Sequence, residues 1–215
     1  MTRLFVFDLD GTLVDSLRDL ADSANDLVVS HGGRPLETTA VARMVGEGAA
    51  TLVSRAFAAA GVDPPSDALS RFLAIYDERL LNHTREYESM SETLRTLSSR
   101  ASLAVLTNKP LAATRRILEG LQLSTFFDGR AVIGGDGPLP RKPDPAGLQQ
   151  LCERAGVAPS DAVLVGDSLV DWQTARNAGT AICLARYGFG FRQFPHETLN
   201  GREQLIDRPI DLLML

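Results

Sequence analysis

Five short apolar runs, spread along the chain, most constrain the fold that this sequence can adopt. The runs occupy residues 3–7, 103–107, 131–134, 162–166 and 180–184. Each is apolar at consecutive rather than alternate positions, which is typical of strands covered on both faces. Helical patterns at 111–120, 145–155 and 171–178 separate the later runs, and a glycine lies at or just after the end of each pattern. Such repeated strand–helix–strand units predict a doubly wound parallel α/β sheet with right-handed crossovers.

The stretch between the first and second runs is far longer than an ordinary crossover. From about residue 15 to residue 85 its pattern is helical, and Leu17, Leu20 and Leu27 belong to one apolar stripe. We predict an inserted α-helical cap domain at 15–87 and a sheet core built from 1–14 and 88–215. Ligands of such sheets bind beyond the carboxyl ends of the strands. A cap inserted after the first strand would therefore cover the ligand site.

The overall composition excludes several classes of partner. The 215 residues carry a net charge of −5 with a pI near 5.2 and no long basic run, which argues against nucleic acid. No apolar stretch approaches the roughly 18 residues of a membrane span, and early acids interrupt any signal-like run. Cys152 and Cys183 are expected in the core rather than in a disulfide. We expect a cytoplasmic monomer or homodimer that binds neither nucleic acid nor membrane.

Two carboxylates, Asp8 and Asp10, stand two positions apart directly after the first run. Like charges about 4 Å apart repel by around 4 kcal/mol at an effective dielectric of 20. Folding gives no reason for such a pair, so it indicates a site where a cation or an incoming group compensates the charge. Polar loops at 107–109, 141–145 and 166–171 follow later strands and would lie along the same sheet edge.

The chemistry of these loops points to phosphoryl transfer. Carboxylates such as Asp167 and Asp171 offer hard oxygen ligands that suit Mg²⁺. The two lysines of the chain, Lys109 and Lys142, both fall in these loops, whereas 20 arginines are scattered. An aspartate can act as the nucleophile on phosphorus, and a second carboxyl can move protons. The Thr107 hydroxyl, nearby amides and Lys142 could then hold phosphoryl oxygens.

Residues 8–16, 107–109, 141–145 and 166–171 together resemble the four sequence motifs of the haloacid dehalogenase superfamily, in the same order. The predicted helical insertion resembles the small α-helical cap of the branch that contains phosphoglycolate phosphatases. Further similarity to that branch extends over residues 45–48, 132–137, 187–190 and 211–213. The resemblance therefore spans nearly the whole chain.

The resemblance also implies roles for individual residues. Asp8 would be the nucleophile and Asp10 the general acid and base. Mg²⁺ would be held by Asp8, the backbone carbonyl of Asp10 and Asp167, with Asp171 as a further partner of the metal site. The implied phosphate-binding residues are Gly11, Thr107, Asn108 and Lys142. The implied substrate-facing residues of the cap loop are Arg43, Gly46, Glu47 and Gly48.

The function implied is a Mg²⁺-dependent phosphatase that acts on a small phosphorylated metabolite through an aspartyl-phosphate, with phosphoglycolate as the first substrate expected. Glu47 would be an awkward neighbour for that doubly anionic substrate unless it faces solvent or pairs with a cap arginine such as Arg43. The alternatives are a phosphomutase of the β-phosphoglucomutase type, a phosphatase for a sugar phosphate or nucleotide, and a silent phosphate-binding protein. The acid at Asp10 disfavours a dehalogenase, and a cap without lysine excludes Schiff-base phosphonatases.

Overall fold

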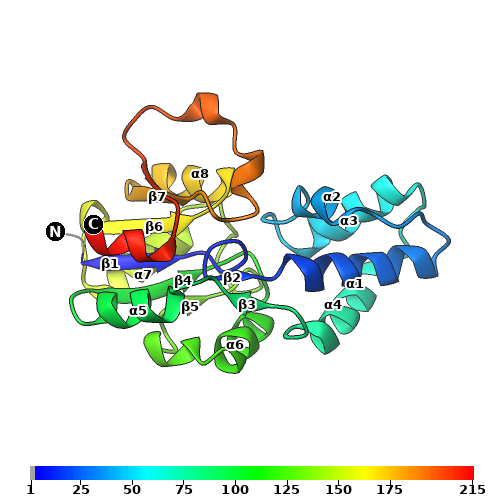
Figure 1. Cartoon of the computed structure of the whole chain (residues 1–215), viewed down its shortest axis with the longest axis horizontal. Helices are drawn as coiled ribbons and strands as arrows, with labels where there is room; N and C mark the ends of the chain where they lie inside the picture. The colour runs from blue at the N-terminus through cyan, green and yellow to red at the C-terminus, as the bar shows by residue number, and fades with distance from the viewer. Residues whose placement is uncertain (1–2) are drawn as a thin grey trace.

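A six-stranded parallel sheet with the strand order β5-β4-β1-β6-β7-β8 forms the centre of the larger of two lobes (Figure 1). The structure is a computed structural model that describes residues 3–215. The strands are β1 (Leu4–Phe7), β4 (Ser102–Leu106), β5 (Val132–Ile133), β6 (Ala162–Gly166), β7 (Ala181–Ala185) and β8 (Gln204–Ile206). The predicted fold class is confirmed, and five of these strands fall on the five apolar runs. β8 was not predicted.

Helices cover both faces of the sheet and explain why its strands are apolar at every position. Phe5 and Phe7 of β1 are buried among side chains of α5 and α6, whereas Leu4 and Val6 are buried among those of α7 and α8. Each fully buried side chain of this size contributes roughly 1.5–3 kcal/mol. The bounds are α5 (Met90–Ser98), α6 (Leu111–Gly120), α7 (Ala146–Ala155) and α8 (Leu169–Ala178). Short 3₁₀ helices are η1 (Leu123–Phe126), η2 (Pro159–Asp161), η3 (Phe191–Gln193), η4 (His196–Thr198) and η5 (Pro209–Met214).

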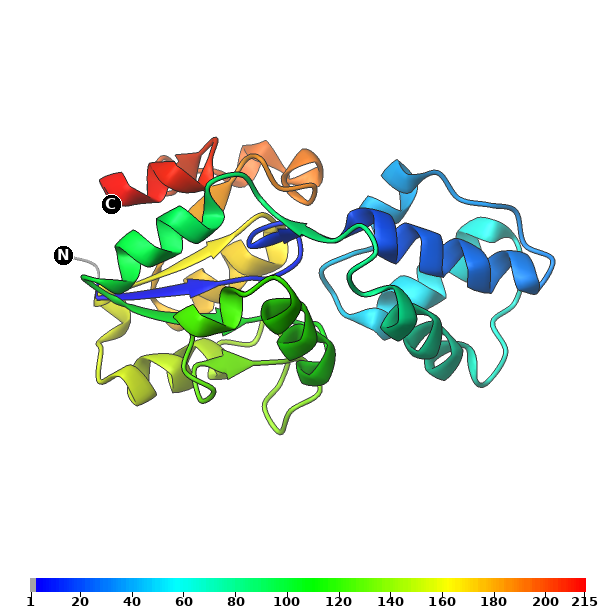
Figure 2. The same ribbon diagram turned by 60° about the horizontal axis from the view of Figure 1, so that its bottom comes forward.

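The segment between β2 and β3 forms a helical unit at the carboxyl ends of the sheet strands (Figure 2). Its helices are α1 (Leu17–Ser30), α2 (Thr38–Ala42), α3 (Ala49–Ala60) and α4 (Ala68–Arg79). The chain enters and leaves this cap through two antiparallel strands, β2 (Val14–Asp15) and β3 (Arg85–Glu86). The buried Asp19 carboxylate of α1 accepts the backbone N–H groups of His83 and Thr84 at 2.8–3.0 Å, which fastens the exit to the entry helix. Within the described residues, none of the helices has the length and apolar character needed to cross a membrane.

Candidate active site

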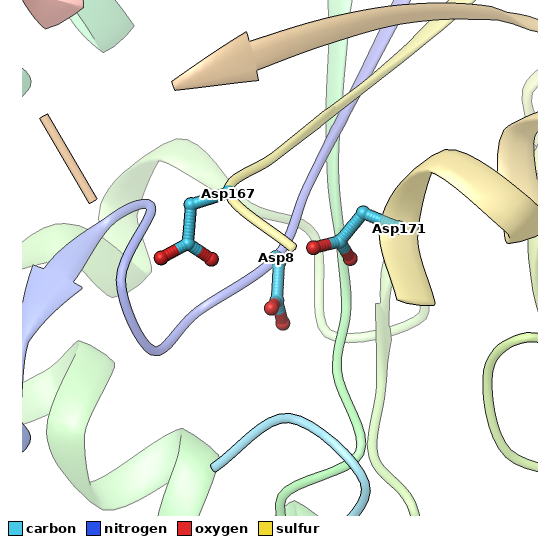
Figure 3. A group of neighbouring side chains, drawn as sticks. All are labelled: Asp8, Asp167 and Asp171. Atoms are coloured by element: carbon cyan, nitrogen blue, oxygen red, sulfur yellow. The ribbon is translucent and has the colours of Figure 1, made fainter. Parts of the chain in front are cut away.

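Three buried carboxylates meet at the carboxyl edge of the sheet. Asp8 follows β1, Asp167 follows β6, and Asp171 lies in the first turn of α8. Figure 3 shows the three side chains gathered around a common space. One oxygen from each lies within 4.8 Å of the others. Residues from separate loops converge here because the carboxyl ends of parallel strands share one edge.

Among the described residues, the polar contacts of the Asp8 carboxylate are made by one of its two oxygens. Oδ1 accepts the Leu9 N–H at 2.7 Å and lies 2.9 Å from Lys142 Nζ. Both contacts are made by Oδ1, which leaves Oδ2 available to a ligand. Burial raises the pKa of Asp8 from 3.8 to about 6, with the Lys142 ammonium opposing the shift and the Asp171 carboxylate adding to it. An incompletely solvated carboxylate with a free oxygen is suited to act as a nucleophile.

Lys142 bridges two of the three carboxylates. Its Nζ lies 2.9 Å from Asp8 Oδ1 and 2.6 Å from Asp171 Oδ1. The other oxygen of Asp171 accepts the Ser168 N–H at 3.1 Å and the Ser168 hydroxyl at 2.5 Å, in a capping box that starts α8. Burial alone would lower the pKa of Lys142, but the Asp171 and Asp8 carboxylates more than offset it and raise that pKa. Lys142 therefore remains an ammonium.

The negative charge of Asp167 is compensated less than the charges of the other two carboxylates. Its Oδ2 accepts the Gly190 N–H at 2.7 Å, and it forms no ion pair within residues 3–215. Burial, together with the Asp171 and Asp8 carboxylates, raises the pKa of Asp167 well above its ordinary value. The backbone packs closely around this side chain, because a Cβ added at Gly11 or Gly188 would overlap it.

Asp10 lies outside the group of three carboxylates and pairs with a different lysine, Lys109. Lys109 Nζ donates to both oxygens of Asp10, at 2.9 and 2.8 Å, and the Ser16 hydroxyl also donates to Oδ1. Burial would lower the pKa of Lys109, but the Asp10 carboxylate raises it. This pairing was not predicted. The scarcity of lysine, with both lysines placed after strands, was the signal in the sequence that could have suggested it.

The two residues that follow β4 serve different purposes. Thr107 is buried and lines the cavity above Asp8, and its Oγ1 accepts the Lys109 N–H at 3.2 Å. Asn108 Nδ2 donates to the backbone carbonyls of Gly46 and Lys142, at 2.9 Å each. Asn108 therefore ties the cap loop to the loop that carries Lys142.

A cavity of about 360 Å³ lies between the cap and the sheet edge. Asp8 and Asp10 line it from the sheet side, and Gly46 and Gly48 of the cap loop line it from above. Gly48 adopts a φ of +93°, which favours glycine, and a Cβ there would lie 3.0 Å from Arg141 Nη1 of the core.

Two of the predicted cap-loop residues point elsewhere. Arg43 is exposed after α2, and neither it nor Glu47 is among the residues that line the cavity. The Glu47 carboxylate faces solvent and accepts from Arg55 Nη2 at 2.7 Å, so its partner is Arg55 rather than Arg43. The negative charge of Glu47 is therefore directed away from the space that an anionic ligand would occupy.

The donor set of the site fits a hard divalent cation. Four carboxylates, three of them buried and one partly buried, and two buried ammonium groups leave a formal charge of −2. Carboxylate oxygens are the ligands that such cations prefer, and the three grouped carboxylates offer no nitrogen or sulfur donor. The charged residues counted are Asp8, Asp10, Lys109, Lys142, Asp167 and Asp171.

The chain is similar to proteins of a known family. The family model of haloacid dehalogenase-like hydrolases matches residues 5–185. A phosphoglycolate phosphatase of Rhodospirillum rubrum is 43% identical over 199 residues, which cover 88% of this chain and 81% of that protein. A phosphoglycolate phosphatase of Pseudomonas putida is 38% identical over 199 residues, which cover 88% of this chain and 71% of that protein. A crystal structure of a predicted phosphoglycolate phosphatase from Haemophilus somnus has a TM-score of 0.90 and 31% sequence identity to this chain. The match covers 99% of this chain and 97% of the chain in that structure.

The chain belongs to the haloacid dehalogenase-like hydrolases. Within that family it is an enzyme of the phosphoric monoester hydrolase class.

Proposed function

We propose that this protein is a Mg²⁺-dependent phosphatase of a small phosphorylated metabolite, with phosphoglycolate as its first candidate substrate. One observation carries the proposal: the buried Asp8 presents a free carboxylate oxygen to a cavity between cap and core. The relatives named as phosphoglycolate phosphatases support the choice of substrate. Cys152 and Cys183 are buried and unpaired, which supports a cytoplasmic location.

The metal would be held by residues at the sheet edge. The ligands would be Asp8, Asp167 and the backbone carbonyl of Asp10. Asp171 would be a further partner of the metal site. Bound Mg²⁺ would neutralise charge that develops on the phosphoryl oxygens. The charge of −2 left on the charged side chains of the site supports this assignment.

Asp8 and Asp10 would divide the chemistry between them. With Asp10 protonated on entry to the first step, Asp8 Oδ2 attacks phosphorus, the bond from phosphorus to the ester oxygen breaks, and Asp10 gives that proton to the departing oxygen. An aspartyl-phosphate then joins Asp8 to the phosphoryl group. Asp10 next removes a proton from water, which attacks phosphorus and releases inorganic phosphate and the free Asp8 carboxylate. Atoms and charges balance over the two steps.

Other residues would orient the phosphoryl group and exclude solvent. Lys142 contacts the nucleophile directly, and with the Thr107 hydroxyl it would hold non-bridging oxygens. Leu52 and Phe72 of the cap cover the cavity with apolar surface. This cover would limit the access of bulk water while the phosphoryl group is transferred.

The test is the release of inorganic phosphate from a panel that contains phosphoglycolate, a sugar phosphate, a nucleoside monophosphate and p-nitrophenyl phosphate. We expect hydrolysis that requires Mg²⁺, is abolished by EDTA, and has its highest kcat/KM on phosphoglycolate. Asp8→Asn should remove turnover of every substrate, whereas Asp63→Asn, an exposed cap substitution, should keep it. Conversion of a sugar phosphate into an isomer without phosphate release would favour a mutase. An inactive wild-type protein across the panel would overturn the proposal.

A further inference from the structure

The cap side of the cavity is apolar except at one place. Leu20, Leu52, Phe72, Leu73 and Leu80 all line it. Asp77 also lines it, but that carboxylate is exposed and paired with Arg116. The exception is Tyr76 of α4, whose side chain joins this wall.

The Tyr76 hydroxyl is buried beside the Lys109 ammonium, and its own O–H has no acceptor among the described residues. The residue is 4% exposed, and its hydroxyl oxygen makes no hydrogen bond within residues 3–215. Its ring is held in place, because it stacks on Phe72 with 5.8 Å between centroids and lies 4.5 Å from Lys109 Nζ. An unpartnered buried hydroxyl is unfavourable by about 1–3 kcal/mol. A rigidly placed group of this kind next to a cavity indicates a ligand that completes its bonding.

Lys109 is the one cation among the described residues that line this cavity. An ammonium has three N–H donors, and two acceptors are supplied by the oxygens of Asp10. The third donor lies on the side of Tyr76, whose ring and hydroxyl border the ammonium. Because Asp10 is the proposed proton donor to the ester oxygen, the space beside Lys109 adjoins the leaving group.

We propose that the Tyr76 hydroxyl and the Lys109 ammonium form a subsite for a carboxylate on the leaving group of the substrate. This inference rests on the proposed function and assigns its substrate selectivity to two residues. The ammonium can only donate and the phenol O–H lacks an acceptor, so together they favour a ligand acceptor, and the positive charge favours an anion. Burial also raises the pKa of Tyr76 to about 12, which keeps the phenol protonated at neutral pH. Glycolate carries such a carboxylate, whereas the hydroxyl-rich leaving group of a sugar phosphate does not.

The test compares phosphoglycolate with ethyl phosphate, in which a methyl group replaces the carboxylate. Wild-type protein should prefer phosphoglycolate. Tyr76→Phe removes one oxygen from the subsite and should lower kcat/KM for phosphoglycolate about 10- to 100-fold, the range expected for a hydrogen bond to a charged group. Its kcat/KM for ethyl phosphate should change less than threefold. A misfolded variant would instead lose both activities.

Tyr87→Phe is the matched control. Tyr87 is half-buried, packs on Tyr187 and does not line the cavity, so the same change there should leave the substrate ratio unaltered. An unchanged ratio in Tyr76→Phe, or an equal loss on both substrates in a variant whose urea unfolding matches that of the wild type, would overturn the subsite.

Binding to a non-hydrolysing background separates this inference from the proposed function. In Asp8→Asn, calorimetry should show tighter binding of phosphoglycolate than of ethyl phosphate, and addition of Tyr76→Phe should remove most of the difference. That result would support the subsite even if wild-type turnover of phosphoglycolate were absent. Equal binding of the two esters would refute the subsite while leaving a phosphatase intact.

Discussion

Replacement of Asp8 by asparagine should abolish turnover and at the same time stabilise the metal-free protein. Asp8 is buried, and its pKa is raised from 3.8 to about 6 mainly because burial disfavours the charged form. A shift of about 2 pKa units makes the native carboxylate less stable by about 3 kcal/mol at neutral pH. Asparagine keeps the shape and the acceptor for the Leu9 N–H but removes the charge. Lys142 retains its bond to Asp171.

The gain in stability of Asp8→Asn over wild type should depend on pH, and the raised pKa of Asp8 sets the direction of that dependence. The native carboxyl holds its proton more tightly than the unfolded one, so ionisation destabilises the wild type as pH rises from about 3.8 to about 6. Relative to wild type, Asp8→Asn should therefore gain about 1 kcal/mol at pH 4.5 and about 3 kcal/mol at pH 8. At pH 8 this corresponds to about 6–12 °C in Tm.

Urea unfolding in EDTA at pH 4.5 and pH 8 measures this difference, with Asp63→Asn as the matched control. Asp63 is an exposed cap residue, so its substitution should change stability by less than about 0.5 kcal/mol at either pH. A variant no more stable than wild type at pH 8, or a gain of equal size at both pH values, would refute the electrostatic reasoning.

Two further substitutions test the packing and charge of the site. Lys142→Met should destabilise the protein by about 3–5 kcal/mol, because it leaves two buried carboxylates without their counter-charge, and urea unfolding would detect it. Gly188→Ala should lower both stability and activity, since its Cβ would overlap the Gly11 carbonyl and the Asp167 side chain. Gly129→Ala, where a Cβ meets nothing within 4 Å, should leave both near wild type. A tolerated Gly188→Ala would show that the loop can relax.

The sheet could be predicted from sequence because burial on both faces leaves a strong apolar signal. β6 spans the predicted residues 162–166, β1 starts one residue later than predicted, and β4 and β7 are each displaced by one residue along the chain. β8 has three residues, and Gln204 and Leu205 are exposed. A short edge strand of this kind carries no apolar run, since one side of it borders solvent. Pairing with β7, which the sequence does not reveal, is what makes it a strand.

The grouping of the motif aspartates could be predicted on topological grounds, whereas the pairing of acids with lysines could not. Parallel strands place every following loop at one edge, whatever the details of each loop. Lys109 and Asp10 are 99 residues apart, and which lysine reaches which acid depends on loop geometry. Tyr76 was missed for another reason. With Phe72 and Leu80 it forms an i, i+4, i+8 row, which is the pattern of an ordinary buried helix face.

The separate lysines suggest how two nearby carboxylates can perform opposite tasks. Lys142 contacts one oxygen of Asp8 and leaves the other unbonded, so it can compensate the charge of the nucleophile without blocking it. Lys109 instead engages both oxygens of Asp10, and its remaining donor faces the cap. A leaving group that carries a carboxylate would approach this second lysine and Tyr76 together. Substrate selection and proton transfer would then meet at Lys109, whereas attack on phosphorus is supported by Lys142.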